Sequence, residues 1–161
     1  MIDPTGAFRE LREALGDLVL ASSEVEESLQ DGIWMLGGAV ENDDKYKVAT
    51  STLGWLVSQF EQHYKKQSKD VLGAEPADDL CEFLRKLSEE RNDLIHAMWT
   101  FDSDGGIARR HRVKKEGGGG LELNVQSVRP DMVLDLASRF RNTGEKLWEI
   151  LLRLEELTRL A

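Results

Sequence analysis

The fold class is decided by residues 77–98, which read ADDLCEFLRKLSEERNDLIHAM. Apolar side chains recur in this stretch every three or four positions, a spacing that is typical of an amphipathic α-helix. Asp78 and Asp79 stand at its start, where negative charge suits the positive end of the helix dipole. The stretch therefore predicts one long helix with a single apolar face. That face consists of Leu80, Phe83, Leu84, Leu87, Leu94, Ile95 and Met98.

Three other stretches show the same periodicity and predict helices over residues 5–37, 43–67 and 131–159. We expect the glycine pair at 37–38 to end the first of them, and Gly54 to permit close packing of the second. The first apolar stripe is Phe8, Leu11, Leu15, Leu18, Val25, Leu29, Ile33 and Leu36, with Ser22 in the missing step. The other two are Val48, Leu53, Leu56, Val57, Phe60 and Tyr64, and Val133, Leu136, Phe140, Leu147, Leu151 and Leu154.

Between the last two predicted helices the pattern changes. Residues 99–127 hold short stretches of alternating apolar and polar side chains, interrupted by the glycine run 117–120. Such alternation with glycines at the turn is typical of a two-stranded β-hairpin. We therefore predict an all-α fold: a four-helix up-down bundle with a β-hairpin inserted between helices 3 and 4. We expect a single domain over residues 1–161, with the insertion at about 99–128.

Composition points to an ordinary globular protein of 161 residues, of which 40% are apolar and 32% charged. No apolar run approaches the roughly 20 residues of a membrane span, and the N-terminus lacks the features of a signal peptide. A single cysteine, Cys81, cannot form an internal disulfide. We therefore expect a cytoplasmic protein without membrane attachment. The scattered histidines, His63, His96 and His111, show no metal-ligand spacing, so we expect neither metal nor cofactor.

The net charge of −9 argues against a general nucleic-acid coat protein, but the charge is uneven. Residues 108–115, ARRHRVKK, form a basic strip. Its basic residues are Arg109, Arg110, Arg112, Lys114 and Lys115. A basic strip on an acidic body can hold a polyanion in one place, so these side chains are candidates for RNA contact. The alternative is a solvated hairpin whose charged side chains prevent pairing at a sheet edge.

The third predicted helix carries Arg91, Asn92 and His96 near its end. Histidine is the side chain whose unperturbed pKa lies near neutrality, so it can give or take a proton there. Arginine is always charged, and its planar fork matches a phosphate. An arginine followed by a polar residue, with a histidine five positions on, therefore suits phosphate chemistry without a metal.

Helical geometry divides this motif between two faces. At about 100° per residue from Leu80, Arg91 falls at about 20°, inside the apolar stripe, whereas His96 falls at about 160°. Asn92 precedes His96 by four positions, so the two are neighbours on the helix surface. The spacing thus places Arg91 toward the core and the Asn92–His96 pair toward solvent.

An arginine inside an apolar stripe needs a carboxylate, because an isolated buried charge is costly. We expect Glu26 of the first helix to pair with Arg91, with Glu24 or Glu27 as alternatives. Internal pairing is therefore one role for Arg91, and phosphate binding is the other. For His96, the alternative to catalysis is a packing role at the surface or at an interface.

These features together resemble the HEPN superfamily. The resemblance is carried by Arg91, Asn92 and His96, late in the third helix of a predicted four-helix bundle, within the string ERNDLIHAMW. Members of that superfamily carry R-x4-6-H, often with Asn, His or Asp directly after the arginine. The string also resembles bacterial HEPN-like families that continue into a tryptophan and a hairpin. The resemblance in fold covers nearly the whole chain, whereas the motif itself is short.

The resemblance implies a metal-independent endoribonuclease with a composite active site at a homodimer interface. His96 would be the general acid or base, Arg91 would stabilise charge on the phosphate, and Asn92 would orient His96 or bind phosphate. The product would be a 2′,3′-cyclic phosphate. Many such proteins are toxins or defence components paired with an antitoxin, often a small nucleotidyltransferase. Others have lost catalysis and bind nucleotides or proteins, which is the alternative function.

Trp99 follows the motif and has two interpretations. As an exposed ring near His96, it would stack on an RNA base, an interaction worth roughly 1–3 kcal/mol. As a packed ring, it would anchor the hairpin. The other tryptophans, Trp34, Trp55 and Trp148, lie on or beside the helix stripes, so we expect them in the core or in a dimer interface.

Overall fold

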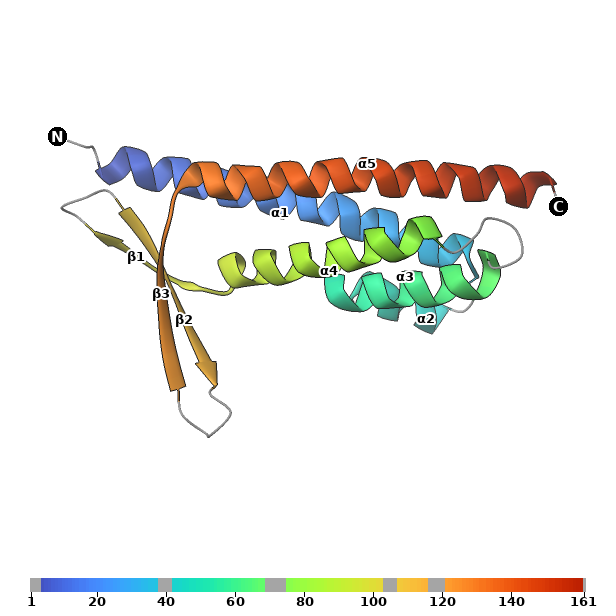
Figure 1. Cartoon of the computed structure of the whole chain (residues 1–161), viewed down its shortest axis with the longest axis horizontal. Helices are drawn as coiled ribbons and strands as arrows, with labels where there is room; N and C mark the ends of the chain where they lie inside the picture. The colour runs from blue at the N-terminus through green and yellow to red at the C-terminus, as the bar shows by residue number, and fades with distance from the viewer. Residues whose placement is uncertain (1–3, 38–41, 69–74, 103–106, 116–120, 161) are drawn as a thin grey trace. The chain divides into compact units, whose positions relative to one another are not determined.

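The computed structural model describes residues 4–37, 42–68, 75–102, 107–115 and 121–160. These ranges are mostly helical, which confirms the helical character predicted from the sequence (Figure 1). The helices are α1 (Pro4–Met35), α2 (Asn42–Ala49), α3 (Leu53–Ser68), α4 (Glu75–Ile95) and α5 (Pro130–Leu160). The strands β1 (Met98–Asp102), β2 (Ile107–Lys115) and β3 (Leu121–Val128) lie between α4 and α5 in the sequence. No helix in the described ranges combines the length and apolar character that crossing a membrane requires.

Residue contacts divide the chain into two compact units. The first, which we call the sheet unit, comprises residues 1–20 and 89–138 and contains all three strands. The second, the helical unit, comprises residues 21–88 and 139–161. Since α1, α4 and α5 contribute residues to both units, the boundaries fall within helices. The expectation of one domain over the whole chain stays a prediction.

The helical unit has an apolar core built from the predicted stripes. Every residue predicted for the stripe of 43–67 is buried, and Leu56, Val57 and Phe60 are fully so. Ser22 is also fully buried, as its place in the first stripe predicts. The other helices contribute Val25, Leu29, Ile33, Leu80, Leu84, Leu87, Phe140, Leu147, Leu151 and Leu154, and Leu36 joins them from the turn after α1. Helical periodicity therefore identified most of the core correctly.

Two phenylalanines of the predicted stripes lie at the surface instead. Phe8 is 42% exposed and Phe83 is 39% exposed. The guanidinium carbon of Arg12 lies 5.6 Å from the centroid of the Phe8 ring, and Arg139 stands at the same distance from Phe83. A cation over an aromatic face is attracted by the ring quadrupole, so these arginines cover the rings that the core leaves out.

The three helix tryptophans are not core residues. Trp34 is 37% exposed, Trp55 38% and Trp148 51%. The core alternative for these residues is therefore wrong. Their place in a dimer interface stays a prediction.

The single helix predicted over residues 43–67 is wrong, because the chain breaks between α2 and α3. The hydroxyls of Thr50 and Ser51 donate to the carbonyls of Tyr46 and Lys47, one turn back. Such bonds compete with the helix ladder. The Thr52 hydroxyl then accepts from the backbone N–H of Trp55 at 3.4 Å and caps the start of α3. The apolar periodicity continues across this break and conceals it.

Close packing occurs at Gly32 rather than at Gly54, where the sequence predicted it. A Cβ added at Gly32 would stand 2.7 Å from the Phe60 ring and 2.8 Å from a methyl group of Leu151. A Cβ added at Gly54 would meet only the Ser88 hydroxyl at 3.9 Å, which is ordinary contact. α1, α3 and α5 therefore pack closely against one another at Gly32.

The end of α1 matches its prediction. Gly37 has φ of 71°, and its N–H donates to the Trp34 carbonyl at 3.0 Å. A left-handed residue directly after a helix satisfies carbonyls that the helix itself leaves unbonded.

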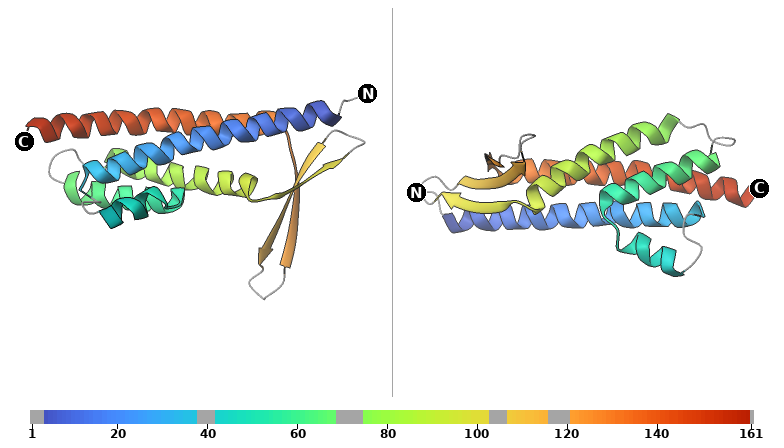
Figure 2. Two further views of the ribbon diagram at one scale, coloured as in Figure 1. Left: turned by 180° about the vertical axis from the view of Figure 1, so that it is seen from behind. Right: turned by 90° about the horizontal axis from the view of Figure 1, so that it is seen from below.

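Charged side chains join α3 to α4, which run side by side in the helical unit (Figure 2). Glu61 accepts from Lys65 at 2.8 Å and from Arg85 of α4. Lys65 also lies 3.0 Å from Asp78. The hydrogen bond from Lys65 lowers the pKa of Glu61 below 4.5; burial opposes this effect and Arg85 adds to it.

The strands form one antiparallel sheet in the order β1-β2-β3, so a third strand joins the expected two-stranded hairpin. The register pairs Trp99 with Arg110, and Arg110 in turn with Gln126. β2 holds the basic strip and is the central strand of the sheet. Only its residues 107–111 pair with β1. Residues 108–111 of β2 therefore pair on both sides, whereas residues 112–115 pair with β3 alone among the described strands. The solvated-hairpin alternative for the basic strip stays a prediction.

Adding a methyl group at Gly32 tests the close approach of the three helices. Gly32→Ala should lower the free energy of unfolding by about 1–3 kcal/mol, because overpacking a fixed core costs that much. Gly16→Ala is the matched control, since a Cβ at Gly16 meets nothing within 4 Å. In the helix it should stabilise by about 0.5–1 kcal/mol. Urea unfolding measures both, and a stabilised Gly32→Ala protein would contradict the packing.

The pKa of Glu61 predicts how stability depends on pH. A carboxyl group whose pKa is lowered on folding contributes stability above its unfolded pKa and loses it as the pH falls through its folded pKa. Unfolding free energy should therefore fall below about pH 4.5, and Glu61→Gln should make this fall shallower. Glu82→Gln is the control, with a smaller effect, because Glu82 and its partner Lys86 are 66% and 63% exposed. Equal effects of the two variants would refute a special role for Glu61.

Candidate functional site

The predicted motif lies at the end of α4, within the sheet unit: Arg91 and Asn92 belong to the helix, and His96 follows it. The final backbone bond of the helix runs from the N–H of His96 to the carbonyl of Asn92 at 3.1 Å. The helix ends at Ile95, whereas the sequence predicted that it continues to residue 98. Met98 instead begins β1. His96 therefore stands at the junction between helix and sheet rather than on a helical surface.

Arg91 and Asn92 are joined directly. The Nη1 of Arg91 donates to the side-chain oxygen of Asn92 at 3.2 Å, and both residues are half-buried. The sequence placed Arg91 toward the core and Asn92 with His96. The observed bond connects the two faces, because the long arginine side chain reaches back to the amide beside it. Asn92 thus belongs to both halves of the motif: its side chain holds Arg91 and its carbonyl receives the His96 N–H.

His96 is exposed, as the helix geometry predicted. An exposed imidazole can exchange protons with solvent or with a bound substrate, which a general acid or base requires. Glu26, the expected partner of Arg91, is half-buried in the helical unit. Their pairing would join the two units and stays a prediction.

Trp99 anchors the sheet to the helix. Its indole N–H donates to the carbonyl of Leu94 at 3.2 Å, and the side chain is partly buried. That carbonyl is one of the last four of α4, which have no partner within the helix. The bond supports the anchoring interpretation of Trp99, and base stacking by its ring stays a prediction.

Arg110 is buried, with 9% of its surface exposed. It donates through Nη2 to the Gln126 side chain on β3, and its Nη1 lies 3.7 Å from a carboxylate oxygen of Asp93 on α4. The sequence suggested that Arg110 contacts RNA, which requires an accessible guanidinium. In the structure this side chain is buried. Arg110 instead bridges the sheet and the helix.

Sequence reasoning did not predict that Asp93 and Gln126 hold Arg110. The register of β2 and β3 would have revealed the Gln126 partner, because residues directly opposite on antiparallel strands are neighbours. The side chains of Arg109, Arg112, Lys114 and Lys115 lie outside the described part of the structure. Their backbone positions on β2 are described, and their contact with RNA stays a prediction.

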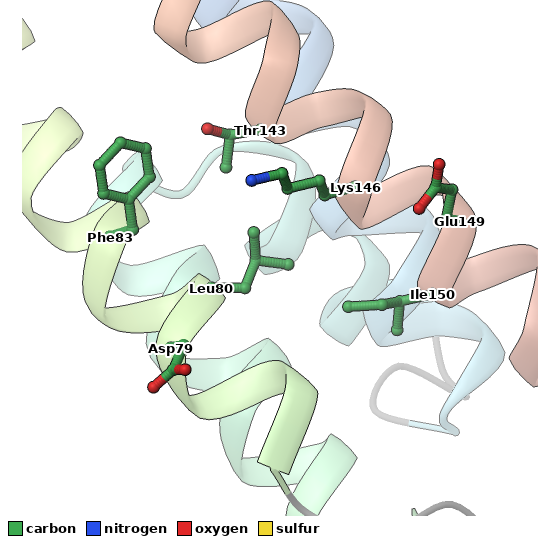
Figure 3. A pocket seen from close by; sticks show the side chains of 7 residues that line it. All are labelled: Asp79, Leu80, Phe83, Thr143, Lys146, Glu149 and Ile150. Carbon is green, nitrogen blue, oxygen red and sulfur yellow. The ribbon is translucent and has the colours of Figure 1, made fainter.

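A second region, in the helical unit, is hollowed between α4 and α5 (Figure 3). This cavity of about 470 Å³ has Leu80 and Phe83 on one side, and Lys146 extends over it from α5. Asp79 and Glu149 lie at its rim. Its lining residues include none of those predicted for catalysis, so it offers an amphipathic surface rather than a reactive centre.

Cys81 lies in the core of the helical unit. Burial raises the pKa of its thiol to about 12. The thiolate is the nucleophilic form of cysteine, so Cys81 is not a nucleophile at neutral pH.

Comparisons with known proteins give no match: no protein-family model, no curated protein and no solved structure is significantly similar to this chain. The assignment of the candidate site therefore rests on its geometry and on the resemblance of its sequence motif.

The bond from Trp99 to the end of α4 predicts a stability effect. Trp99→Phe keeps an aromatic ring but removes the N–H donor, so the free energy of unfolding should fall by about 0.5–1.5 kcal/mol. Trp55→Phe is the control, because Trp55 is an exposed tryptophan of α3. Chemical unfolding followed by circular dichroism measures both. A Trp99→Phe protein as stable as the Trp55→Phe protein would contradict the anchoring role.

Proposed function

We propose that this chain is a HEPN-like, metal-independent endoribonuclease whose active site is completed in a homodimer. The fold we assign to it is a four-helix up-down bundle with the β-sheet insertion between its last two long helices. The observation that carries the proposal is the arrangement at the end of α4. An exposed His96 follows, within five residues, a half-buried Arg91 that is hydrogen-bonded to Asn92.

The proposed reaction is an in-line transfer within RNA. One His96 removes the proton of a ribose 2′-hydroxyl, and the resulting oxygen attacks the adjacent phosphorus. The bond from phosphorus to the 5′-oxygen breaks, and the leaving oxygen takes a proton from the second His96 of the dimer. The products are a 2′,3′-cyclic phosphate and a 5′-hydroxyl.

Arg91 supplies positive charge for the phosphate oxygens in the transition state. Its bond to Asn92 fixes the guanidinium, and a fixed donor needs no reorganisation as charge develops. Arginine has five N–H groups, so one guanidinium can bond more than one acceptor at a time. The biological setting that we propose is a toxin or defence system with a cognate antitoxin, such as a small nucleotidyltransferase.

A second candidate function is a catalytically inactive module that binds nucleotides or proteins. The cavity between α4 and α5 favours it, because apolar Leu80 and Phe83 lie beside the charged Lys146 (Figure 3). Cavities that combine apolar walls with a few polar groups are typical binding sites. The two candidates differ in whether purified protein cleaves RNA.

Replacing His96 tests the enzyme. RNA cleavage in EDTA by His96→Ala should fall by about 10²–10⁴-fold, because a positioned acid or base contributes that much. His63→Ala is the matched control, since His63 is a partly exposed histidine of α3 outside the motif, and it should retain activity. A cyclic phosphate at the new 3′-end identifies the mechanism. A folded wild-type dimer that cleaves no RNA, with or without its antitoxin partner, would refute the enzyme and favour the binding module.

A further inference from the structure

A groove of about 320 Å³ lies between α1 and α5, which are neighbours in the helical unit (Figure 2). Buried Ala21 and Val25 line it from α1, and Gly144 lines it from α5. A Cβ added at Gly144 would stand 3.3 Å from a methyl group of Val25, so the two helices approach closely here. Small side chains on both helices therefore leave a shallow channel along their contact.

A large aromatic side chain borders this groove and is not covered by the core. Trp148 of α5 lines the groove, yet 51% of its surface is exposed. Leu152, one helical turn further along α5, is 45% exposed. On α1, Met35 is 42% exposed and follows Ser28 of the groove lining by two helical turns, so it lies on the same helix face. Exposed tryptophans are enriched among the residues that contribute most to protein–protein binding.

The same groove carries negative charge without internal compensation. Residues 13–44 hold nine acidic and no basic side chains, a charge equal to the net charge of −9 of the whole chain. Of these, Glu24 lines the groove from α1 and is exposed, as is Glu145 on α5. Neither carboxylate forms an ion pair among the described residues. Arg141 also lines the groove but has an interaction partner of its own.

These charges restrict what can cover the groove. RNA and anionic membranes would be repelled by the carboxylates. A second copy packed on the same face would bring identical carboxylates together, because a two-fold interface pairs a surface with itself. A segment with lysine or arginine beside apolar side chains complements both the charge and the exposed Trp148 ring. An amphipathic helix presents such side chains along one face and fits grooves of this kind.

We propose that the groove between α1 and α5 is a docking surface for a basic amphipathic helix of a partner protein. Apolar side chains of that helix cover Trp148 and Leu152, and its basic side chains pair with Glu24 and Glu145. The proposal goes beyond the proposed ribonuclease and does not depend on it. Its residues lie in the helical unit, whereas the Arg91–His96 motif lies in the sheet unit.

Fluorescence anisotropy of labelled peptides, titrated with the full-length protein, tests the surface. The probe is an amphipathic leucine–lysine helix of about 14 residues, which is about four helical turns. A scrambled peptide keeps its composition and charge but loses the apolar face, and a leucine–glutamate peptide keeps the face but reverses the charge. The leucine–lysine helix should bind roughly 10-fold or more tightly than either. Equal binding of the scrambled peptide, or no binding of the leucine–lysine helix, would overturn the proposal.

Matched variants locate the contact. Trp148→Ala should weaken binding of the leucine–lysine helix by roughly 10-fold or more, as expected for a tryptophan at the centre of an interface. Trp55→Ala is the control, because Trp55 is exposed on α3 and does not line the groove. Glu145→Lys should weaken binding by roughly 10-fold, whereas Glu89→Lys makes the same change at an exposed residue of α4 and should leave binding unchanged. Equal losses within the glutamate pair would overturn the proposal, and this pair decides if Trp148→Ala does not fold.

Sedimentation velocity distinguishes a partner helix from a second copy of the chain. Trp148→Ala should leave the oligomeric state of the protein unchanged, because the groove takes a different protein. A wild-type dimer that dissociates in Trp148→Ala would show that a second copy occupies the groove, and would overturn the proposal.

Discussion

The position of the end of α4 depends on the pairing of one buried positive charge, the guanidinium of Arg110. A guanidinium removed from water has to be paired, and Arg110 obtains its partners from two different elements: Gln126 on β3 and Asp93 on α4. Either partner alone would leave the charge poorly satisfied. Their combination fixes the strand register on one side of Arg110 and the position of the α4 end on the other. The motif residues before and after Asp93 are therefore held in place by a contact in which they take no part.

Under the proposed ribonuclease function, an acidic chain has to present a site for RNA. With a net charge of −9, long-range attraction to a polyanion is weak. Recognition then has to come from short-range contacts, such as hydrogen bonds to a base and a few fixed donors near the phosphate. Asp93 illustrates the principle, because its charge is directed toward Arg110 instead of toward solvent. An enzyme of this kind would select its substrate by fit more than by charge.

Helical periodicity predicted the class of the fold and most of its core, since one apolar face per helix is a local property of the sequence. It failed where short-range polar groups decide the structure. The hydroxyls of Thr50 and Ser51 and the cap at Thr52 divide a helix whose apolar stripe continues unbroken.

The contacts among the candidate site residues could not be predicted from the sequence. His96 is exposed as expected, whereas the Arg91–Asn92 bond required the actual reach of an arginine side chain. The role of Arg110 was misjudged because its partners come from a strand and a helix distant in sequence. Strand register and tertiary pairing are not encoded in any local spacing.

The burial of Cys81 has a consequence for the chain as a whole. With its pKa raised to about 12, the sole cysteine exists as a neutral thiol under physiological conditions. Disulfides and many oxidants react with the thiolate, so the folded protein offers them no reactive thiol. Its single cysteine therefore says little about the redox compartment in which the protein works. Cys81 becomes reactive in molecules whose core has opened.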